Sequence, residues 1–392
     1  MADGAFPRAL MQQPVDARMA YFRSFTIAHP RLKEADLALR KAIEDPAGLS
    51  LVFVYGPTGV GKTTLRLRIE KYFAQALLDV LQQDPGHIPV VSVEAVADAG
   101  QFSWKDYYRR ALVAMEEPLI DRKITYRVRS VFRDGTGRFA FAPHAIGLEM
   151  RYALESALLH RRPAAFFIDE AQHLTKMRSG RKLQDQLDSI KSLANLTKTI
   201  HVLVGTYELL PFRNLSGQLS RRSVDIHFPR YRADRREDCA AFQSVLFTFQ
   251  CHLPLAGQTD LLKHFDFCYE RSIGCVGVLK DWLTRALAVA LSQGNPLLTR
   301  RILEQTAWSV SQCQRMANEA IEGEADLTEN EEDRGSLRKL LGLDTMPFRS
   351  PAIPAPPQAI LPINKARRPR VGQRQPVRDA VGVSHGASYA RA

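Results

Sequence analysis

The sequence predicts an α/β fold, a doubly wound parallel sheet, and two observations carry this prediction. Short apolar runs alternate with segments of helical pattern, and the runs lie at residues 50–55, 88–95, 164–169, 201–205 and 223–228. The first, third and fourth runs are almost continuously apolar, as strands are when helices cover both faces of a parallel sheet. The alternation favours crossover helices between neighbouring parallel strands.

We expect four parts along the chain. Residues 1–30, interrupted by prolines, form an irregular N-terminal arm, and residues 31–231 form the α/β core. Residues 232–343 have a helical pattern throughout, which predicts a small C-terminal helical domain. Residues 344–392 are rich in proline and basic side chains, a composition typical of disordered tails.

Residues 119–142 interrupt the alternation inside the core. The stretch ITYRVRSVF alternates in polarity, the turn-forming segment Asp134–Gly137 follows it, and RFAF comes next. Two alternating segments around a Gly-rich turn predict a β-hairpin insertion.

Composition excludes several classes of protein. Hydrophobic residues make up 45% of the 392 residues, which is too many for a wholly disordered chain. We find neither an apolar run long enough for a membrane helix nor a secretory signal, and therefore expect a cytoplasmic protein. The five cysteines form no CxxC pair, which favours reduced thiols over a zinc site.

The net charge of +12 is concentrated in two stretches. Residues 347–392 carry eight Lys/Arg and one Asp, and residues 119–142 carry six Lys/Arg and two Asp. Such patches most often bind nucleic acid, and an acidic protein surface is the alternative.

A complete phosphate-binding motif follows the first predicted strand and opens a helix. Its residues are Gly56, Pro57, Thr58, Gly59, Val60, Gly61, Lys62 and Thr63, followed by Thr64. In this context the motif predicts a P-loop that binds ATP through backbone N–H groups and a helix N-terminus. Lys62 would neutralise the β- and γ-phosphates, and the Thr63 hydroxyl would ligate Mg²⁺.

Two carboxylates end the third apolar run. Because parallel strands end at one edge of the sheet, Asp169 and Glu170 should lie beside the P-loop. We expect Asp169 to hold Mg²⁺ and Glu170 to act as the general base toward the attacking water.

Two further positions resemble those of AAA+ ATPases. Thr206 follows the fourth run, where these proteins carry a polar residue between the γ-phosphate and the attacking water. Arg221 and Arg222 precede the fifth run, where they carry the arginine finger that reaches a neighbouring subunit. The sequence leaves open which of the two arginines acts.

Together these motifs resemble the TnsC/TniB group of transposition ATPases over roughly residues 20–310. The matching blocks are YFRSFTIAHPRLKEADLALRKAIE, FIDEAQHL, LVGTYEL with QLSRR, and RSIGCVGVLKDWLTRALAVA with NPLLTRRILEQ. The resemblance implies an AAA+ P-loop NTPase with a helical lid. It also implies homo-oligomeric rings or filaments on double-stranded DNA that link a target-selection protein to a transposase. One departure is Lys280, which replaces the arginine that many relatives use to sense the γ-phosphate from the lid.

Basic residues after the second strand are our candidates for DNA contact: Lys105, Arg109, Arg110, Lys123, Arg127 and Arg129. Aromatic residues lie among them, which are Trp104, Tyr107, Tyr108 and Tyr126. Cations interleaved with aromatics can follow phosphates without reading bases. The alternative is an amphipathic surface helix whose aromatic face lies in the core.

Two other functions stay open. The chain could be an AAA+ ATPase of another system, such as a helicase loader, a replication initiator or a secretion-assembly ATPase. It could instead be a nucleotide-gated adaptor with negligible hydrolysis.

Overall fold

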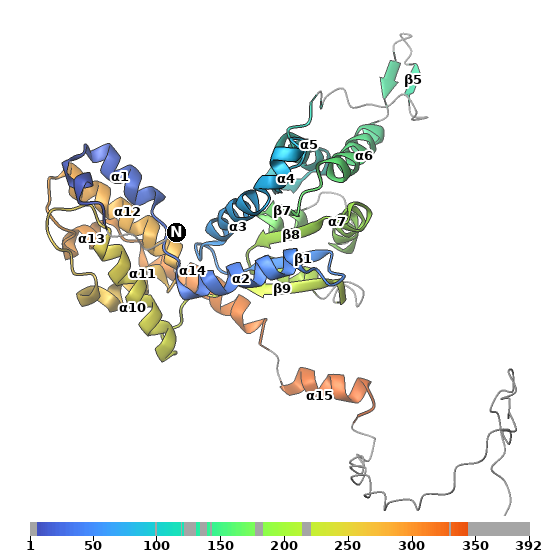
Figure 1. The fold of residues 1–392 in the computed structure, drawn as a ribbon. Coiled ribbons are helices and arrows are strands. Elements are labelled where there is room, and N and C mark those ends of the chain that lie inside the picture. Colours follow the sequence, from blue (N-terminus) through green and yellow to red (C-terminus); the bar gives the residue numbers. More distant parts are fainter. Residues whose placement is uncertain are drawn as a thin grey trace, which may run out of the picture. The chain divides into compact units, whose positions relative to one another are not determined.

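A computed structural model describes residues 6–98, 100–118, 120, 131–133, 139–141, 143–176, 183–213, 221–328 and 331–343 (Figure 1). The chain divides into two compact units, one ending at Thr328 and one beginning at Glu329. Of the second unit, the structure describes helix α15 (Glu331–Leu340) and the turn after it. The predicted tail, residues 344–392, lies outside the described residues.

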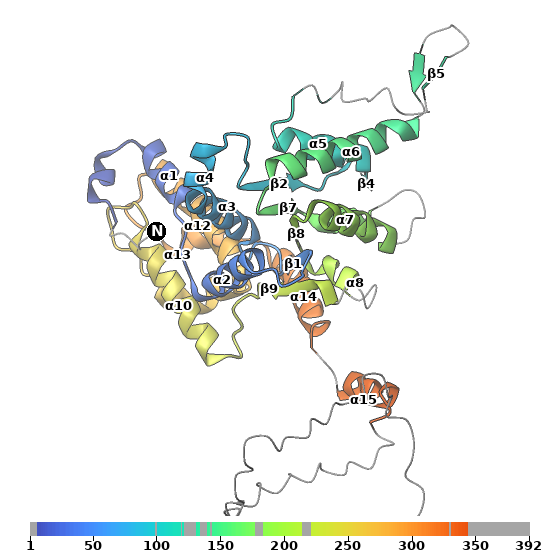
Figure 2. The ribbon, with the colours of Figure 1, turned by 45° about the vertical axis from the view of Figure 1, so that its right-hand side comes forward.

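A five-stranded sheet forms the centre of the first unit in the part of the chain that is described. Its strands are β1 (Leu51–Tyr55), β2 (Val90–Glu94), β7 (Ala165–Asp169), β8 (Ile200–Gly205) and β9 (Ser223–His227). They run parallel in the order β2-β7-β8-β1-β9, with β1 between β8 and β9 (Figures 1 and 2). All five predicted strands are confirmed.

Helices cover both faces of this sheet (Figure 2). One face packs against α2 (Pro30–Glu44) and α3 (Lys62–Ala76). The other packs against α5 (Trp104–Ala114), α6 (Pro143–Arg161) and α7 (Leu183–Thr197).

Successive side chains of β1 point to opposite faces of the sheet, and all of them are buried. Val52 and Val54 join the cluster with α2 and α3, whereas Leu51, Phe53 and Tyr55 join the other. The continuous apolar run is therefore explained by burial on both sides, and the doubly wound architecture is confirmed.

Side-chain caps begin two of these helices. The His29 ring accepts a hydrogen bond from the backbone N–H of Leu32, and Pro30 takes the first turn of α2, where no N–H is required. Ser103 caps α5 by accepting from the N–H of Asp106.

A group of helices, called the helical domain below, follows the sheet within the first unit. It contains α10 (Arg236–Cys251), α11 (Phe265–Ser272), α12 (Val276–Ser292), α13 (Arg300–Thr306) and α14 (Val310–Ala325). Trp282 of α12 is fully buried in its core, and its indole N–H donates to the Leu303 carbonyl at 3.1 Å. The small helical domain predicted from the pattern is present.

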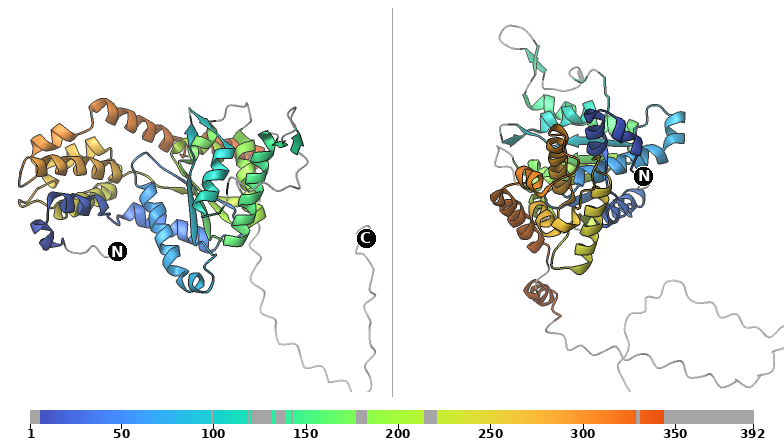
Figure 3. Two further views of the ribbon diagram at one scale, coloured as in Figure 1. Left: turned by 90° about the horizontal axis from the view of Figure 1, so that it is seen from above. Right: turned by 90° about the vertical axis from the view of Figure 1, so that its left-hand side faces the viewer.

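The N-terminal segment differs from the irregular arm that we expected. Residues Val15–Ser24 form helix α1, which lies beside the helices of the helical domain (Figure 3). Met19, Phe22 and Ile27 are buried in the same cluster as Trp282. Met19 and Phe22 lie on one face of α1, and Ile27 follows in the extended segment after it, so α1 packs into the core of the helical domain.

The insertion contains two short strands among its described residues, β5 (Val131–Arg133) and β6 (Phe139–Phe141). They pair antiparallel, with Val131 opposite Phe141, as the predicted hairpin requires.

The remaining described elements are short. They are η1 (Arg8–Gln12), α4 (Leu78–Gln83), β3 (Ala97–Asp98), β4 (Gln101–Phe102), η3 (Ala171–Thr175), η4 (Tyr207–Leu209), α8 (Leu210–Arg213) and η5 (Leu262–His264). Among the described helices, none has both the length and the apolar composition needed to cross a membrane.

Candidate nucleotide-binding site

The predicted P-loop connects β1 to α3 at the carboxyl edge of the sheet. Gly59 and Gly61 have φ angles of 74° and 115°, a region that side chains other than glycine rarely enter. A Cβ on Gly56 would lie 2.1 Å from the Phe228 carbonyl oxygen, because the loop passes directly over the end of β9. The loop therefore requires glycine for two reasons: the positive φ angles at positions 59 and 61, and the close approach of position 56 to the Phe228 carbonyl.

Lys62 turns back into its own loop. Its Nζ donates to the carbonyls of Gly56 and Pro57, each at 2.9 Å. Burial lowers the pKa of Lys62, while the nearby carboxylates Glu170 and Asp169 act to raise it. The ammonium thus lies inside the loop, where a phosphate could replace the two carbonyls as its partner.

Asp169 is the last residue of β7, and its side chain contacts α3. Its Oδ1 accepts from the backbone N–H of Glu170 at 3.0 Å, and its Oδ2 accepts from Arg66 Nε at 3.1 Å. Thr63 lies exposed in the first turn of α3. A carboxylate and a hydroxyl are the oxygen ligands that Mg²⁺ prefers, so these residues fit that ion.

Glu170 has a φ of 51°, a left-handed conformation that bends the chain sharply out of β7. Its side chain accepts a short hydrogen bond from Gln172 Nε2. The Gln172 Oε1 in turn accepts from the backbone N–H of Thr206 at 3.3 Å. A Cβ on Gly205 would lie 2.4 Å from that oxygen, so glycine makes room for the amide.

Gln172 therefore links the predicted general base to the end of β8, and the sequence analysis missed it. The available signal was its place two residues after Glu170 in the DEAQHL block.

The Thr206 hydroxyl is buried and has no hydrogen-bond partner among the described residues. A buried polar atom without a partner is costly, which fits a group that pairs with a ligand. Thr206 follows β8, and β8 lies between β7 and β1, so the sheet brings its position to the same edge as Glu170 and Lys62.

Helix α12 of the helical domain begins against the P-loop. The backbone N–H of Val278 donates to the Gly59 carbonyl at 3.2 Å. A Cβ on Gly277 would lie 2.4 Å from the same oxygen, so close contact again requires glycine. Lys280 lies one turn further, but its Nζ donates to the Arg23 carbonyl at 2.8 Å, which directs the ammonium toward the N-terminal segment.

Arg221 and Arg222 are exposed at the start of β9. The Arg222 carbonyl accepts from the backbone N–H of Ser50, which precedes β1. The pair therefore lies at the amino edge of the sheet, and the P-loop lies at the opposite edge. A five-residue strand spans about 17 Å, so these two arginines lie at the other end of the sheet from the P-loop of their own chain.

The three candidate DNA contacts on α5, Lys105, Arg109 and Arg110, are exposed. The aromatic part of that prediction is wrong, because Tyr107 and Tyr108 are only 2% and 6% exposed and belong to the core. Their spacing is that of a buried helix face.

Trp104 also turns inward, and its indole N–H donates to Gln186 at 2.6 Å. Lys123, Arg127 and Arg129, together with Tyr126, lie outside the described residues.

Two cavities are lined by basic side chains. In a groove of about 430 Å³ beside β2, Arg109 and Arg110 are balanced by Glu94 and Asp106, and Arg110 pairs with Asp106 at 2.6 Å.

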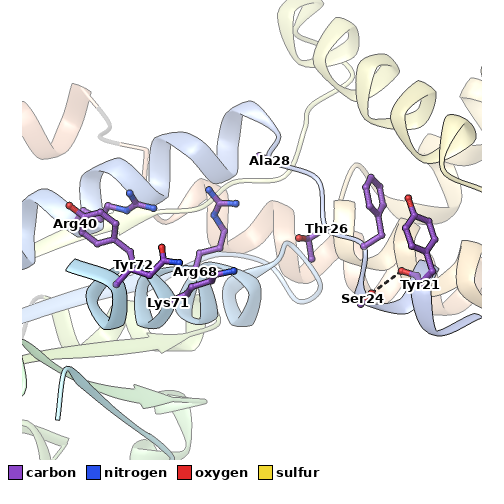
Figure 4. Close-up of a pocket in the computed structure, with 10 residues that line it drawn as sticks. Tyr21, Ser24, Thr26, Ala28, Arg40, Arg68, Lys71 and Tyr72 are labelled. Atoms are coloured by element: carbon purple, nitrogen blue, oxygen red, sulfur yellow. Dashed lines mark hydrogen bonds between the residues drawn. The ribbon is translucent and has the colours of Figure 1, made fainter. Parts of the chain in front are cut away.

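A second cavity, of about 510 Å³, lies between α2, α3 and residues 21–28 (Figure 4). Arg40, Arg68 and Lys71 line it opposite Tyr21. Asp36 pairs with Arg40 at 2.7 Å and lies 3.7 Å from Arg68. The cavity lies along α3 beyond the P-loop and suits an anionic group.

The fold is that of the AAA+ P-loop NTPases, a nucleotide-binding class. The features that define it are the P-loop after β1, the carboxylates at the end of β7, the strand order of the sheet, and the contact of the helical domain with the P-loop. Consistent with this, residues 47–212 match a family model described as an AAA domain. A comparison with curated protein sequences gives no match.

Several solved structures resemble the chain at low sequence identity. The ORC2 protein of Aeropyrum pernix is 16% identical, with a TM-score of 0.48, covering 75% of this chain and 71% of that one. The Aeropyrum pernix ORC1 protein in complex with DNA is 18% identical, with a TM-score of 0.46 and coverage of 78% and 70%. Cdc6p of Pyrobaculum aerophilum is 14% identical, with a TM-score of 0.44 and coverage of 73% and 69%.

Proposed function

We propose that this protein binds ATP with Mg²⁺ and hydrolyses it to ADP and phosphate. One observation carries the proposal: Lys62, Asp169, Glu170 and Thr206 come from three neighbouring strands and meet at one edge of the sheet. Backbone N–H groups of residues 56–64 would hold the phosphates. Thr63 and Asp169 would hold Mg²⁺, which supplies charge neutralisation at the transferred phosphoryl group.

Glu170 would orient the attacking water and accept its proton. Its carboxylate is held by Gln172, whose amide oxygen accepts from the Thr206 backbone N–H, and the Thr206 hydroxyl has no partner among the described residues, so water and phosphate could be placed between the two groups. Lys62 would leave its loop carbonyls for the phosphates and stabilise the developing negative charge.

We further propose that the protein assembles as a homo-oligomer on double-stranded DNA and connects a target-selection protein to a transposase. The support is the ordered set of sequence blocks that resemble TnsC/TniB proteins. The position of Arg221 and Arg222, far from their own P-loop, also favours a site completed by a neighbouring subunit. The exposed cations of α5 offer a surface for DNA phosphates.

Electron microscopy tests this assembly directly. The purified protein would be imaged with double-stranded DNA in the presence of ATP, a slowly hydrolysed analogue, or no nucleotide. Rings or filaments that form on DNA only with nucleotide are expected. Particles that do not associate with DNA in any nucleotide state would contradict the transposition role and favour an AAA+ ATPase of another system.

A further inference from the structure

A further charged side chain, Arg66, contacts the candidate metal ligand Asp169, and the proposed reaction does not use it. Arg66 of α3 places its Nε 3.1 Å from Asp169 Oδ2. Its Nη1 forms a short contact with Glu70 on the next turn of the helix. The side chains of Arg66 and Asp169 are only 18% and 14% exposed, so water screens this pair weakly.

The position of Arg66 along the helix accounts for this contact. Arg66 follows Thr63 by three residues and Lys62 by four, and such residues lie on one face of an α-helix. The face that presents the P-loop lysine and threonine to a nucleotide therefore also presents a guanidinium to β7.

We propose that Arg66 is a positioning residue that competes with Mg²⁺ for Asp169. This inference rests on the proposed function of the site. Before metal binds, the guanidinium neutralises the carboxylate; when Mg²⁺ approaches, two cations meet at one oxygen and repel each other. Arg66 thereby sets the magnesium concentration at which the protein holds its nucleotide.

Glu70 gives the displaced guanidinium a second partner. It already contacts Arg66 Nη1, and it also accepts a short hydrogen bond from the Ser92 hydroxyl of β2. Arg66 can therefore leave Asp169 and keep a hydrogen-bonded carboxylate, which avoids an unpaired buried charge. The network thus has two arrangements, one with Arg66 shared between both acids and one with Arg66 on Glu70 alone.

The competing explanation is purely structural: the ion pair between Arg66 and Asp169 only fastens α3 to β7. In that case, removal of Arg66 would lower thermal stability and leave the magnesium dependence of nucleotide binding unchanged.

The test measures binding of a fluorescent ADP to the full chain while Mg²⁺ is raised from micromolar to millimolar concentrations. Arg66→Met should lower the half-saturating Mg²⁺ concentration about tenfold, equivalent to about 1.4 kcal/mol. The half-saturating Mg²⁺ concentration of Arg66→Lys should fall between those of Arg66→Met and the unaltered protein. Glu70→Gln removes the second partner, holds Arg66 on Asp169, and should raise the half-saturating concentration.

Arg68→Met is the matched control, because Arg68 lies on the same helix and contacts Asp36, 3.7 Å away, instead of Asp169. Mn²⁺ binding in the presence of ADP, followed by electron paramagnetic resonance, gives a readout that requires no turnover. Unchanged metal dependence in Arg66→Met and Glu70→Gln would overturn the inference. Absence of nucleotide binding by the unaltered protein at every Mg²⁺ concentration would overturn the proposed function itself.

Discussion

The phosphate site and the α5 surface both contain charged side chains, but they are held in different ways. At the phosphate site, Asp169 pairs with Arg66 across 103 positions, and Gln172 accepts from the backbone N–H of Thr206 across 34 positions. On α5, Arg110 pairs with Asp106 one turn away, and their side chains are 48% and 39% exposed.

This difference predicts how substitutions act in each region. A side chain that is held by contacts to distant parts of the chain keeps one position, so its substitution should abolish the one binding or catalytic step in which it takes part. Exposed cations contribute Coulomb attraction that salt screens, so their losses are small and roughly additive. The following experiments test that contrast, from the largest expected effect to the smallest.

Glu170→Gln should slow ATP hydrolysis about 10²–10⁴-fold, because the amide cannot accept the proton of the attacking water. Nucleotide affinity should change little, since the phosphate-binding loop is intact. Steady-state phosphate release and equilibrium nucleotide binding measure the two quantities. A rate equal to that of the unaltered protein would favour the adaptor with negligible hydrolysis.

Acid should destabilise the sheet beneath the site. Burial lowers the pKa of His29 and of His201 to about 4, and His201 lies fully buried in β8. Between pH 6.5 and 4 the unfolded chain takes up protons that the folded chain does not. The free energy of unfolding is therefore highest above pH 6.5 and decreases as the pH falls toward 4.

His201→Leu should reduce this acid-dependent loss by about 2–3 kcal/mol, as a shift of one pKa unit corresponds to 1.36 kcal/mol. Urea unfolding at a series of pH values measures it, with the exposed His160→Gln as the control. An unaltered pH slope in His201→Leu would show that His201 is not the titrating group.

Gln172→Leu should lower the rate of ATP hydrolysis about tenfold and leave nucleotide affinity unchanged, since it removes the amide that holds Glu170 and Thr206 but no group of the phosphate-binding loop. Gln172→Asn, with a shorter amide, should restore part of the rate. Gln186→Leu replaces an equally buried glutamine that bonds Trp104 instead and serves as the matched control. Equal losses in both variants would assign Gln172 a merely structural role.

Charge reversal on α5 should have the smallest effect. Lys105→Glu and Arg109→Glu should each weaken binding to double-stranded DNA a few-fold and reduce the salt dependence of binding by about one phosphate contact. Fluorescence anisotropy at several salt concentrations measures both effects, with Lys263→Glu, at 77% side-chain exposure in the helical domain, as the control. Identical DNA affinities for the α5 variants and the control variant would show that α5 does not contact DNA.

Local patterns in the sequence predicted the strands and the P-loop, because apolar runs and the glycine spacing depend on neighbouring residues. For the aromatics of α5 the stated alternative holds, an amphipathic helix with its aromatic face in the core, since Tyr107 and Tyr108 are buried and Trp104 packs against the same core. Contacts between distant segments were not predictable. Arg66 meets Asp169, and α1 joins the helical domain, only because the tertiary fold brings them together.

The position of β9 limits how the nucleotide-binding region can be isolated as a fragment. A fragment cut at residues 47–212, the stretch matched by the AAA model, would keep the P-loop but lack β9. Strand β1 would then become an edge strand with unpaired backbone groups along an apolar run. Such edges recruit strands from other molecules, so this fragment would aggregate unless it extended at least through His227.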